Sequence, residues 1–273
     1  MTSWSSFAPV TSDFNGDGYA DLAVGVPTAT VGGKAKAGYV SVVFGGANGP
    51  GPHGTARITQ STAEVPGTPE AGDRFGGSVV SSHIDDPCGP EELARGGGIH
   101  IHYGDGREPV GEGQTLNQDT PGVPGTAETG DDFGSALTAA DVDGDGKDDL
   151  IAGAPGEAIG TAARAGSVTV LKGGTKGILD ARGAADAVAY QQNSPGVLGV
   201  AQAGDTFGAA LATGDHNGDG VPDLSVAAPG ENSGAGGVWD LTGATAGGSV
   251  VTPNSLGLPA SADPPAYGAV LGR

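Results

Sequence analysis

Three short acidic segments of the chain carry the residue types that bind a hard divalent cation. They read DFNGDGYADL at 13–22, DVDGDGKDDL at 141–150 and DHNGDGVPDL at 215–224. Each segment has Asp or Asn at positions 1, 3 and 5, Gly at position 6 and Asp at position 9. Ca²⁺ takes about six to eight oxygen ligands, and side chains two residues apart on a tight loop can converge on one centre. The spacing therefore predicts about three bound Ca²⁺ ions per chain.

The predicted ligands are the side chains at positions 1, 3, 5 and 9 and the backbone carbonyl at position 7. They are Asp13, Asn15, Asp17, Tyr19 and Asp21 in the first loop, Asp141, Asp143, Asp145, Lys147 and Asp149 in the second, and Asp215, Asn217, Asp219, Val221 and Asp223 in the third. The second loop has four carboxylates and the others three, so it is expected to bind tightest unless Lys147 offsets the charge. The alternative is an acidic turn held by Asx-type hydrogen bonds without metal.

These loops do not fit an EF-hand, which needs a bidentate Glu at position 12 between two helices. Position 12 is Val24, Ala152 or Val226, each in an apolar run that reads as a strand. The pattern therefore predicts calcium loops within β-hairpins.

The loops belong to a repeat. Phe-Gly pairs begin at Phe75, Phe133 and Phe207, and Tyr-Gly begins at Tyr267, with spacings of 58, 74 and 60 residues. FGSALTAAD, DLIAGAP and GSVTVLKGG read as three short strands bounded by glycines, and a stretch near Gln118 is a candidate fourth. Helices are expected to be nearly absent. Four short antiparallel strands per repeat predict an all-β chain of propeller blades, with a β-sandwich as the alternative.

Phe-Gly, an Asp-rich loop and then VGVP, AGAP or VAAP resemble the FG-GAP repeat, from Asp13 to the end of the chain. That family builds the seven-bladed β-propeller of integrin alpha subunits, and its metal site is completed by the Asp at position 9. The resemblance implies a single propeller domain over 1–273 with about four blades. The expected repeats are 1–72, 73–130 (degenerate), 131–204 and 205–263, with another strand beginning in 264–273. Either an open arc or a smaller closed ring would result.

The segment SSHIDDPCGPEEL stands where a fourth loop is due. In register with the other loops, His83 takes position 1, Pro87 position 5, Cys88 position 6 and Glu91 position 9. A Pro supplies no side-chain ligand, so residues 83–95 are predicted to lack calcium and a strand. A decayed loop and an adapted one both remain open.

Composition limits the partners. The 273 residues carry 32 Asp and Glu against 12 Lys and Arg, a net charge of −20, which disfavours nucleic acid and anionic membranes. The sequence shows no membrane span and no signal peptide, and the single Cys excludes an intrachain disulfide. By resemblance, the protein is expected to be secreted and to bind a protein or glycan on the face opposite the calcium loops. The sequence does not indicate the oligomeric state.

No catalytic residues are predicted, since no nucleophile–base pattern appears. His100 and His102 share one side of an expected strand, but further zinc ligands are not evident. The favoured interpretation is a calcium-binding adhesion or binding module that is not an enzyme. The alternative is a non-catalytic fragment or accessory domain of a secreted hydrolase of phospholipase or esterase type, since some FG-GAP propellers are joined to such enzymes.

Overall fold

The computed structural model describes residues 13–47, 49, 54–63, 65, 67–79, 96–102, 113–245, 247–257 and 266–271. The chain forms two compact units, one within residues 1–83 and 102–111 and the other within 84–101 and 112–273. The single propeller domain over 1–273 stays a prediction. The degenerate segment 83–95 lies outside the described residues.

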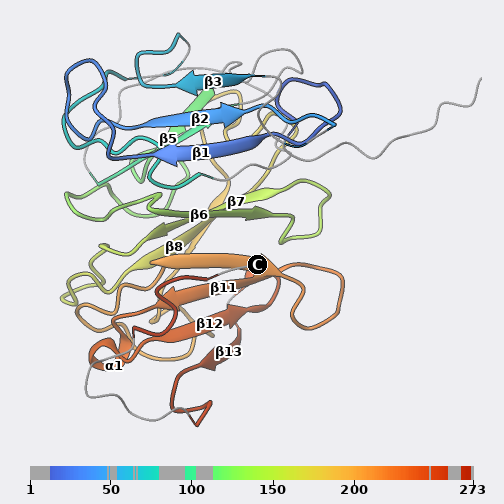
Figure 1. Ribbon diagram of the computed structural model, residues 1–273. Coiled ribbons are helices and arrows are strands. Elements are labelled where there is room, and N and C mark those ends of the chain that lie inside the picture. The colour runs from blue at the N-terminus through green and yellow to red at the C-terminus, as the bar shows by residue number, and fades with distance from the viewer. Residues whose placement is uncertain are drawn as a thin grey trace, which may run out of the picture. The chain divides into compact units, whose positions relative to one another are not determined.

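The described secondary structure is almost entirely antiparallel β-sheet (Figure 1). The strands are β1 (Leu22–Val26), β2 (Tyr39–Val43), β3 (Thr55–Ile58), β4 (Ile99–His102), β5 (Gly113–Leu116), β6 (Ala136–Ala140), β7 (Asp149–Ala154), β8 (Ser167–Leu171), β9 (Ala187–Tyr190), β10 (Ala210–Gly214), β11 (Asp223–Ala228), β12 (Gly237–Leu241) and β13 (Gly248–Val251). The helical elements α1 (Glu231–Gly234) and η1 (Thr242–Ala244) are single turns. The expectation of a nearly helix-free all-β chain is confirmed.

Each sheet is a meander, in which strands that are consecutive in sequence are neighbours. The orders are β1-β2-β3, β4-β5, β6-β7-β8-β9 and β10-β11-β12-β13. The predicted strands in FGSALTAAD, DLIAGAP and GSVTVLKGG are β6, β7 and β8, and β5 ends just before Gln118. Four-stranded meanders that recur along the chain are blades of a propeller, and they are not the Greek-key sheets of a sandwich.

Successive repeats are joined at the Phe-Gly pair. A glycine just before a strand of one repeat (β2, β4, β8 or β12) forms a parallel bridge with the aromatic residue that opens the next repeat. The pairs are Gly38–Phe75 in the first unit, and Gly97–Phe133, Gly166–Phe207 and Gly236–Tyr267 in the second. At the third joint, the Phe207 N–H donates to the Ala165 carbonyl at 2.9 Å. The Phe-Gly repeat in the sequence therefore marks the contact between neighbouring sheets.

Only glycine fits this joint. A Cβ on Gly166 would lie 2.2 Å from the Phe207 carbonyl oxygen, and Gly166 has φ of +87°. The residue just before the aromatic is also left-handed at each joint, although it is not glycine. These residues are Arg74, Asp132, Thr206 and Ala266, with φ between +46° and +58°. The joint therefore stores backbone strain that the surrounding packing must offset.

That packing is a shared core of the third and fourth repeats. Phe207 is fully buried, and its ring meets the Trp239 ring edge-on, with centroids 5.4 Å apart. Both rings belong to one cluster with residues of the third repeat such as Ile151 and Val168. Burying an aromatic side chain of this size contributes about 1.5–3 kcal/mol. Trp239 therefore packs in the core between the two repeats.

The joint predicts a large difference between two glycine substitutions of similar backbone angle. Gly166→Ala should lower the free energy of unfolding by about 2 kcal/mol more than Gly204→Ala, because its new methyl group meets backbone atoms. Gly204 has φ of +88° and open space around its Cβ position, so it reports the cost of the backbone angle alone. Urea unfolding of both variants at fixed calcium measures the difference. Equal losses in the free energy of unfolding would show that the backbone at the joint moves to make room for the methyl group.

Candidate metal centres

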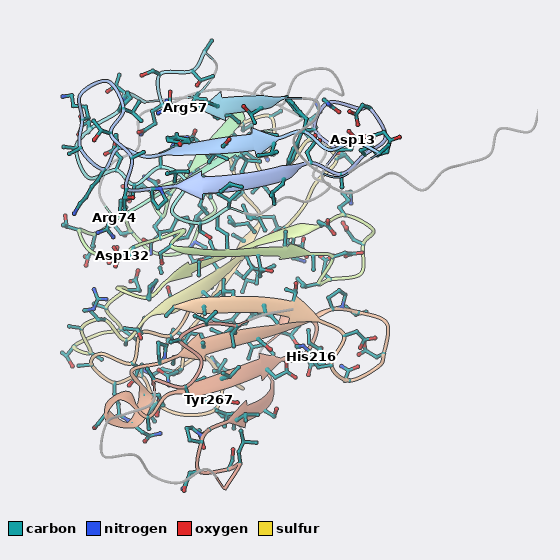
Figure 2. The ribbon with its side chains drawn as sticks, in the orientation of Figure 1. Asp13, Arg57, Arg74, Asp132, His216 and Tyr267 are labelled. Atoms are coloured by element: carbon teal, nitrogen blue, oxygen red, sulfur yellow. The ribbon has the colours of Figure 1, made fainter. Side chains whose placement is uncertain are left out.

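The second and third acidic loops each connect the first two strands of a sheet. Residues 141–149 join β6 to β7, and 215–223 join β10 to β11, while 13–21 lead into β1. Figure 2 labels Asp13 and His216 on two of these loops. The glycines at positions 4 and 6 have positive φ in every copy, between +72° and +91°. A side chain there would be strained, so the glycines permit the tight turn that points the acidic residues inward.

The carboxylate at position 1 organises each loop by accepting backbone N–H groups. Asp13 accepts from the N–H groups of Gly16, Asp17 and Gly18 at 2.8–3.1 Å. Asp215 repeats this arrangement with residues 218, 219 and 220 at 2.7–3.1 Å. In the second loop Asp141 accepts from Asp145 and Gly146. The loops are therefore folded around their own carboxylates.

The Asp at position 9 ties the loop to the end of another strand of its sheet, which is β2 in the first loop, β8 in the second and β12 in the third. Asp149 accepts the N–H of Val142 at 3.2 Å and that of Gly173, just past β8, at 2.8 Å. Asp21 and Asp223 make the corresponding bonds to Gly45 at 2.7 Å and Gly243 at 3.0 Å. Asp149 is fully buried, and burial, partly offset by the Gly173 hydrogen bond, raises its pKa to about 6. This residue is thus a structural anchor as well as a predicted ligand.

The structure brings three of the predicted carboxylates together in the second loop. Ligand atoms of Asp141, Asp143 and Asp149 all lie within 4.8 Å of one another. The fourth, Asp145, pairs with Lys147, whose Nζ lies 2.6 Å from Asp145 Oδ2. A hydrogen bond from Lys147 lowers the pKa of Asp145, and the same contact raises the pKa of the lysine. Three clustered carboxylate oxygens suit Ca²⁺, so the residues fit the ion that the repeat implies.

The ligands of the other two loops form no comparable carboxylate group within the part of the chain that the structure describes. Positions 3 of these loops are amides, and both amide oxygens accept an N–H, Asn15 from Asp17 and Asn217 from Asp219. Asp17 and Asp219 accept the N–H groups of Tyr19 and Val221, the predicted carbonyl ligands. The ligand sets in all three loops stay predictions.

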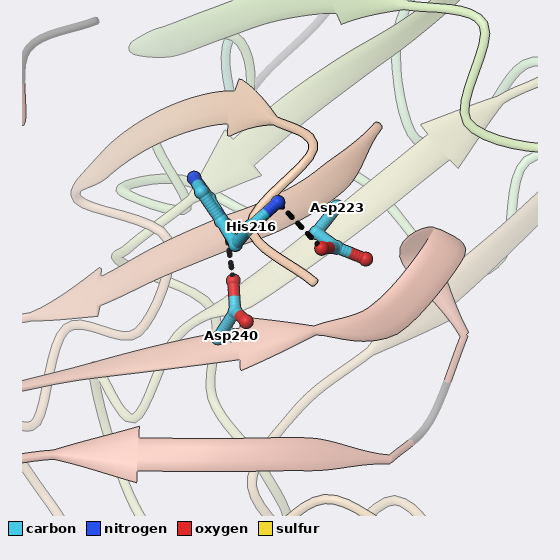
Figure 3. A group of neighbouring side chains, drawn as sticks. All are labelled: His216, Asp223 and Asp240. Atoms are coloured by element: carbon cyan, nitrogen blue, oxygen red, sulfur yellow. Dashed lines mark hydrogen bonds and ion pairs between the residues drawn. The ribbon is translucent and has the colours of Figure 1, made fainter. Parts of the chain in front are cut away.

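One neighbour of the third loop was missed by the sequence analysis. His216 Nδ1 lies 2.7 Å from Asp240 Oδ1, and the His216 backbone N–H donates to Asp223 (Figure 3). The ladder β11–β12 places Asp240 where the second unit's other full sheet has Val170, and His216 stands at the position of Val142. This repeat therefore has a polar pair where its neighbour has two valines. The pair lies 24 residues apart, so only the repeat alignment could have indicated it.

A second missed residue is Lys172. Its Nζ lies 3.0 Å from Asp143 Oδ2, so two of the second loop's predicted ligand residues are paired with lysines. The hydrogen bond that Lys172 donates to Asp143 raises the pKa of Lys172. Lys172 follows β8 directly, next to the Gly173 that Asp149 binds. The sequence analysis considered only Lys147, because Lys172 is brought next to the loop by the pairing of β7 with β8 and is distant from it in sequence.

His100 is half-buried on β4, and Thr115 Oγ1 of β5 lies 3.2 Å from its Nδ1. Two groups of potential metal ligands occur among the described residues, and neither includes His100. They are Asp141 with Asp143 and Asp149, and His216 with Asp223 and Asp240. The side chain of His102 lies outside what the structure describes.

Buried amide–carboxyl pairs occupy the opposite end of the sheets. Gln118 Nε2 donates to Glu157 at 2.5 Å, and Gln192 Nε2 donates to Glu231 at 2.6 Å. Burial raises the pKa of both glutamates, opposed by these hydrogen bonds and reinforced by Asp131 and Asp205 respectively. The Oε1 atoms of both glutamines are buried without a partner. Each pair therefore leaves an acceptor unsatisfied beside a carboxylate that burial disfavours.

Replacing Glu231 of the second pair by glutamine is predicted to increase stability in a pH-dependent way. Because burial raises the pKa of Glu231, its ionised form costs stability above the folded pKa, and this cost disappears below the unfolded pKa. Glu231→Gln removes the charge and offers an N–H₂ to Gln192 Oε1. It should raise the free energy of unfolding by about 1 kcal/mol at pH 7–8 and give no gain near pH 4.

Thermal unfolding at both pH values checks this prediction. Glu70→Gln, at an exposed position, is the matched control and should change stability little at either pH. A Glu231→Gln gain that is equally large at pH 4 would contradict the electrostatic origin.

The fold and loops together define a class of protein, a β-propeller-type repeat protein with Asp-rich hairpin loops. The FG-GAP repeat model matches residues 6–43, 133–171 and 207–239, in the first, third and fourth predicted repeats. The chain therefore contains three FG-GAP repeats, as the sequence resemblance indicated.

Curated relatives share part of this chain. Phosphatidylinositol-glycan-specific phospholipase D from Mus musculus is 36% identical over 102 residues, covering 37% of this chain and 11% of the relative. The Homo sapiens protein is 36% identical over 126 residues, covering 45% of this chain and 14% of the relative. The Bos taurus protein is 37% identical over 101 residues. The similarity thus spans a small part of those proteins and identifies a propeller module.

Proposed function

We propose that the protein is a calcium-binding propeller module that binds a partner outside the cell and performs no catalysis itself. The observation that carries this proposal is the grouping of Asp141, Asp143 and Asp149 within 4.8 Å, in a loop whose pattern occurs three times. FG-GAP repeats often bind calcium, which supports the same proposal. Calcium would neutralise the inward carboxylates and add its binding energy to each hairpin, since the metal binds the folded loop.

The extracellular setting agrees with this chemistry, because loops of modest affinity are filled by millimolar calcium. Among the described residues, no helix has the length and apolar character needed to cross a membrane. The repeats and the phospholipase D relatives favour the same location.

A second candidate is an accessory propeller in a larger secreted hydrolase. The relatives favour it, since each matched stretch is only 11–14% of a protein named for phospholipase D activity. Under this proposal the module positions a catalytic domain or its substrate, and the calcium loops keep the role described above.

Calcium binding is tested by removing one ligand charge. The wild-type chain should bind about three Ca²⁺ and have a higher melting temperature in calcium than in chelator. Each filled site should add about 2.7 kcal/mol to the free energy of unfolding when calcium is a hundredfold above Kd. Asp219→Asn should weaken one site at least tenfold while keeping an oxygen for the Val221 N–H. Isothermal titration calorimetry and native mass spectrometry count the sites.

Asp132→Asn is the control, because it removes the same charge from an exposed position outside the loops. Identical melting temperatures in calcium and chelator, or no bound calcium in native spectra, would refute the calcium proposal.

The partner is proposed to be a protein or glycan that binds the end of the sheets opposite the calcium loops. In the second unit this end carries the β7–β8 connection, where the exposed Arg164 lies 3.8 Å from Asp132. Arg164→Glu should reduce capture of cell-surface ligands by the calcium-loaded protein at least fivefold, since reversing a rim charge slows association.

Arg182→Glu provides the matched control. Arg182 is 87% exposed and lies in the β8–β9 connection, at the end that carries the calcium loops. Capture measured on intact cells, in calcium and in chelator, compares the two variants. Equal losses from both would exclude the proposed face.

A further inference from the structure

The second calcium loop differs from the others in holding two ammonium groups against its predicted ligands. Lys147 Nζ is 2.6 Å from Asp145 Oδ2, and Lys172 Nζ is 3.0 Å from Asp143 Oδ2. Both carboxylates are partly accessible, and the lysines are about one-third to two-fifths exposed. Each lysine thus faces an oxygen that an incoming Ca²⁺ would use.

The neighbouring repeats show that the fold does not require these lysines. The ladders align Leu171 of β8 with Leu241 of β12, because each pairs with the leucine that follows a position-9 Asp. Lys172 therefore corresponds to Thr242 and Lys147 to Val221. In the first unit the same positions hold Phe44 and Tyr19. The backbone bonds of the position-9 Asp are nevertheless present in all three loops.

An acidic cleft next to the second loop can receive the Lys172 side chain when it leaves Asp143. A cleft of about 410 Å³ lies beside the loop and is lined by Asp143, Asp145 and Lys172, with Asp180 and Asp186 contributing further carboxylates. The electrostatic influence of Asp186 on Lys172 shows that an alternative acidic neighbour is close. The lysine can therefore give up one carboxylate without becoming isolated from negative charge.

We propose that Lys147 and Lys172 are built-in competitors of calcium that make the second loop the weakest of the three sites and the last to fill. This inference rests on the proposed calcium function. Ca²⁺ must displace both ammonium groups, and afterwards it lies close to two positive charges. The additional carboxylate of this loop is thereby offset, which reverses the order of affinity that the count of carboxylates alone predicts.

The test isolates the second loop and replaces its lysines by the residues of the third. Asp17→Ala and Asp219→Ala disable the other loops, and Lys147→Val and Lys172→Thr are then introduced into this background. A monovalent cation about 5 Å from Ca²⁺ in a solvated site weakens binding roughly tenfold. Calorimetry should therefore show Ca²⁺ affinity rising about tenfold for each replacement.

Lys176→Thr is the matched control. Lys176 lines the same cleft, so the substitution removes an equal charge outside the two ion pairs, and affinity should change less than threefold. The reciprocal variant Thr242→Lys, in a chain with only the third loop intact, should weaken calcium binding about tenfold.

A direct measurement follows the lysines themselves. The wild-type chain is treated with a limiting amount of an amine-reactive acetylating reagent, and acetylation is measured by mass spectrometry. Acetylation of Lys147 and Lys172 should increase severalfold when Ca²⁺ replaces chelator. Labelling of Lys176 should stay constant. This readout depends on release of the lysines and is independent of the fitted affinity.

The outcomes separate the two proposals. If the background protein binds no calcium with or without the lysine replacements, the calcium function fails for this loop. If it binds calcium but Lys172→Thr and Lys147→Val gain no more than Lys176→Thr, and labelling is unchanged, calcium function stands and the competitor role is wrong.

Discussion

The close approach of a glycine to the aromatic residue that opens the next repeat is the contact on which the sheets depend. At Gly166 there is no room for even one methyl group, because the Phe207 backbone lies against the Cα. This approach brings the Phe207 ring into the core shared by the third and fourth repeats. It also forces Thr206, a β-branched residue, into a left-handed conformation at φ of +57°. The burial of Phe207 stabilises an arrangement that local backbone preferences oppose.

In the sheets β6–β9 and β10–β13, acidic side chains are stabilised in different ways at the two ends. At one end, carboxylates such as Asp141 and Asp215 accept backbone N–H groups of their own loops, so they are solvated by the chain and remain open to a cation. At the other end, Glu157 and Glu231 are paired with glutamine amides, and burial raises the pKa of each. A chain of net charge −20 therefore depends on hydrogen bonds more than on its few cations to hold its acidic groups.

How much of this could be read from the sequence depends on the distance between partners. The strands β6, β7 and β8 were predictable because short apolar or alternating runs are bounded by glycines. The acidic loops were predictable because all five ligand positions lie within nine residues. Lys172 could not be assigned to the second loop, since it reaches Asp143 only through the β7–β8 ladder. The Gln192–Glu231 pair was in principle detectable, because the same 39-residue separation recurs in Gln118–Glu157.

The repeats also show why a shared motif does not make the loops equivalent. In all three loops the position-9 Asp accepts the N–H of a glycine that stands two residues past a strand of its sheet, so this backbone geometry is common to them. What differs is the side chains beside that geometry. One repeat has Lys147 and Lys172 where the next has Val221 and Thr242, and that next repeat has the His216–Asp240 pair where the first has two valines. The backbone sets where a cation could lie. The side chains that reach the loop from the sheet set how strongly each loop can hold it, and these vary because the fold places no demand on them.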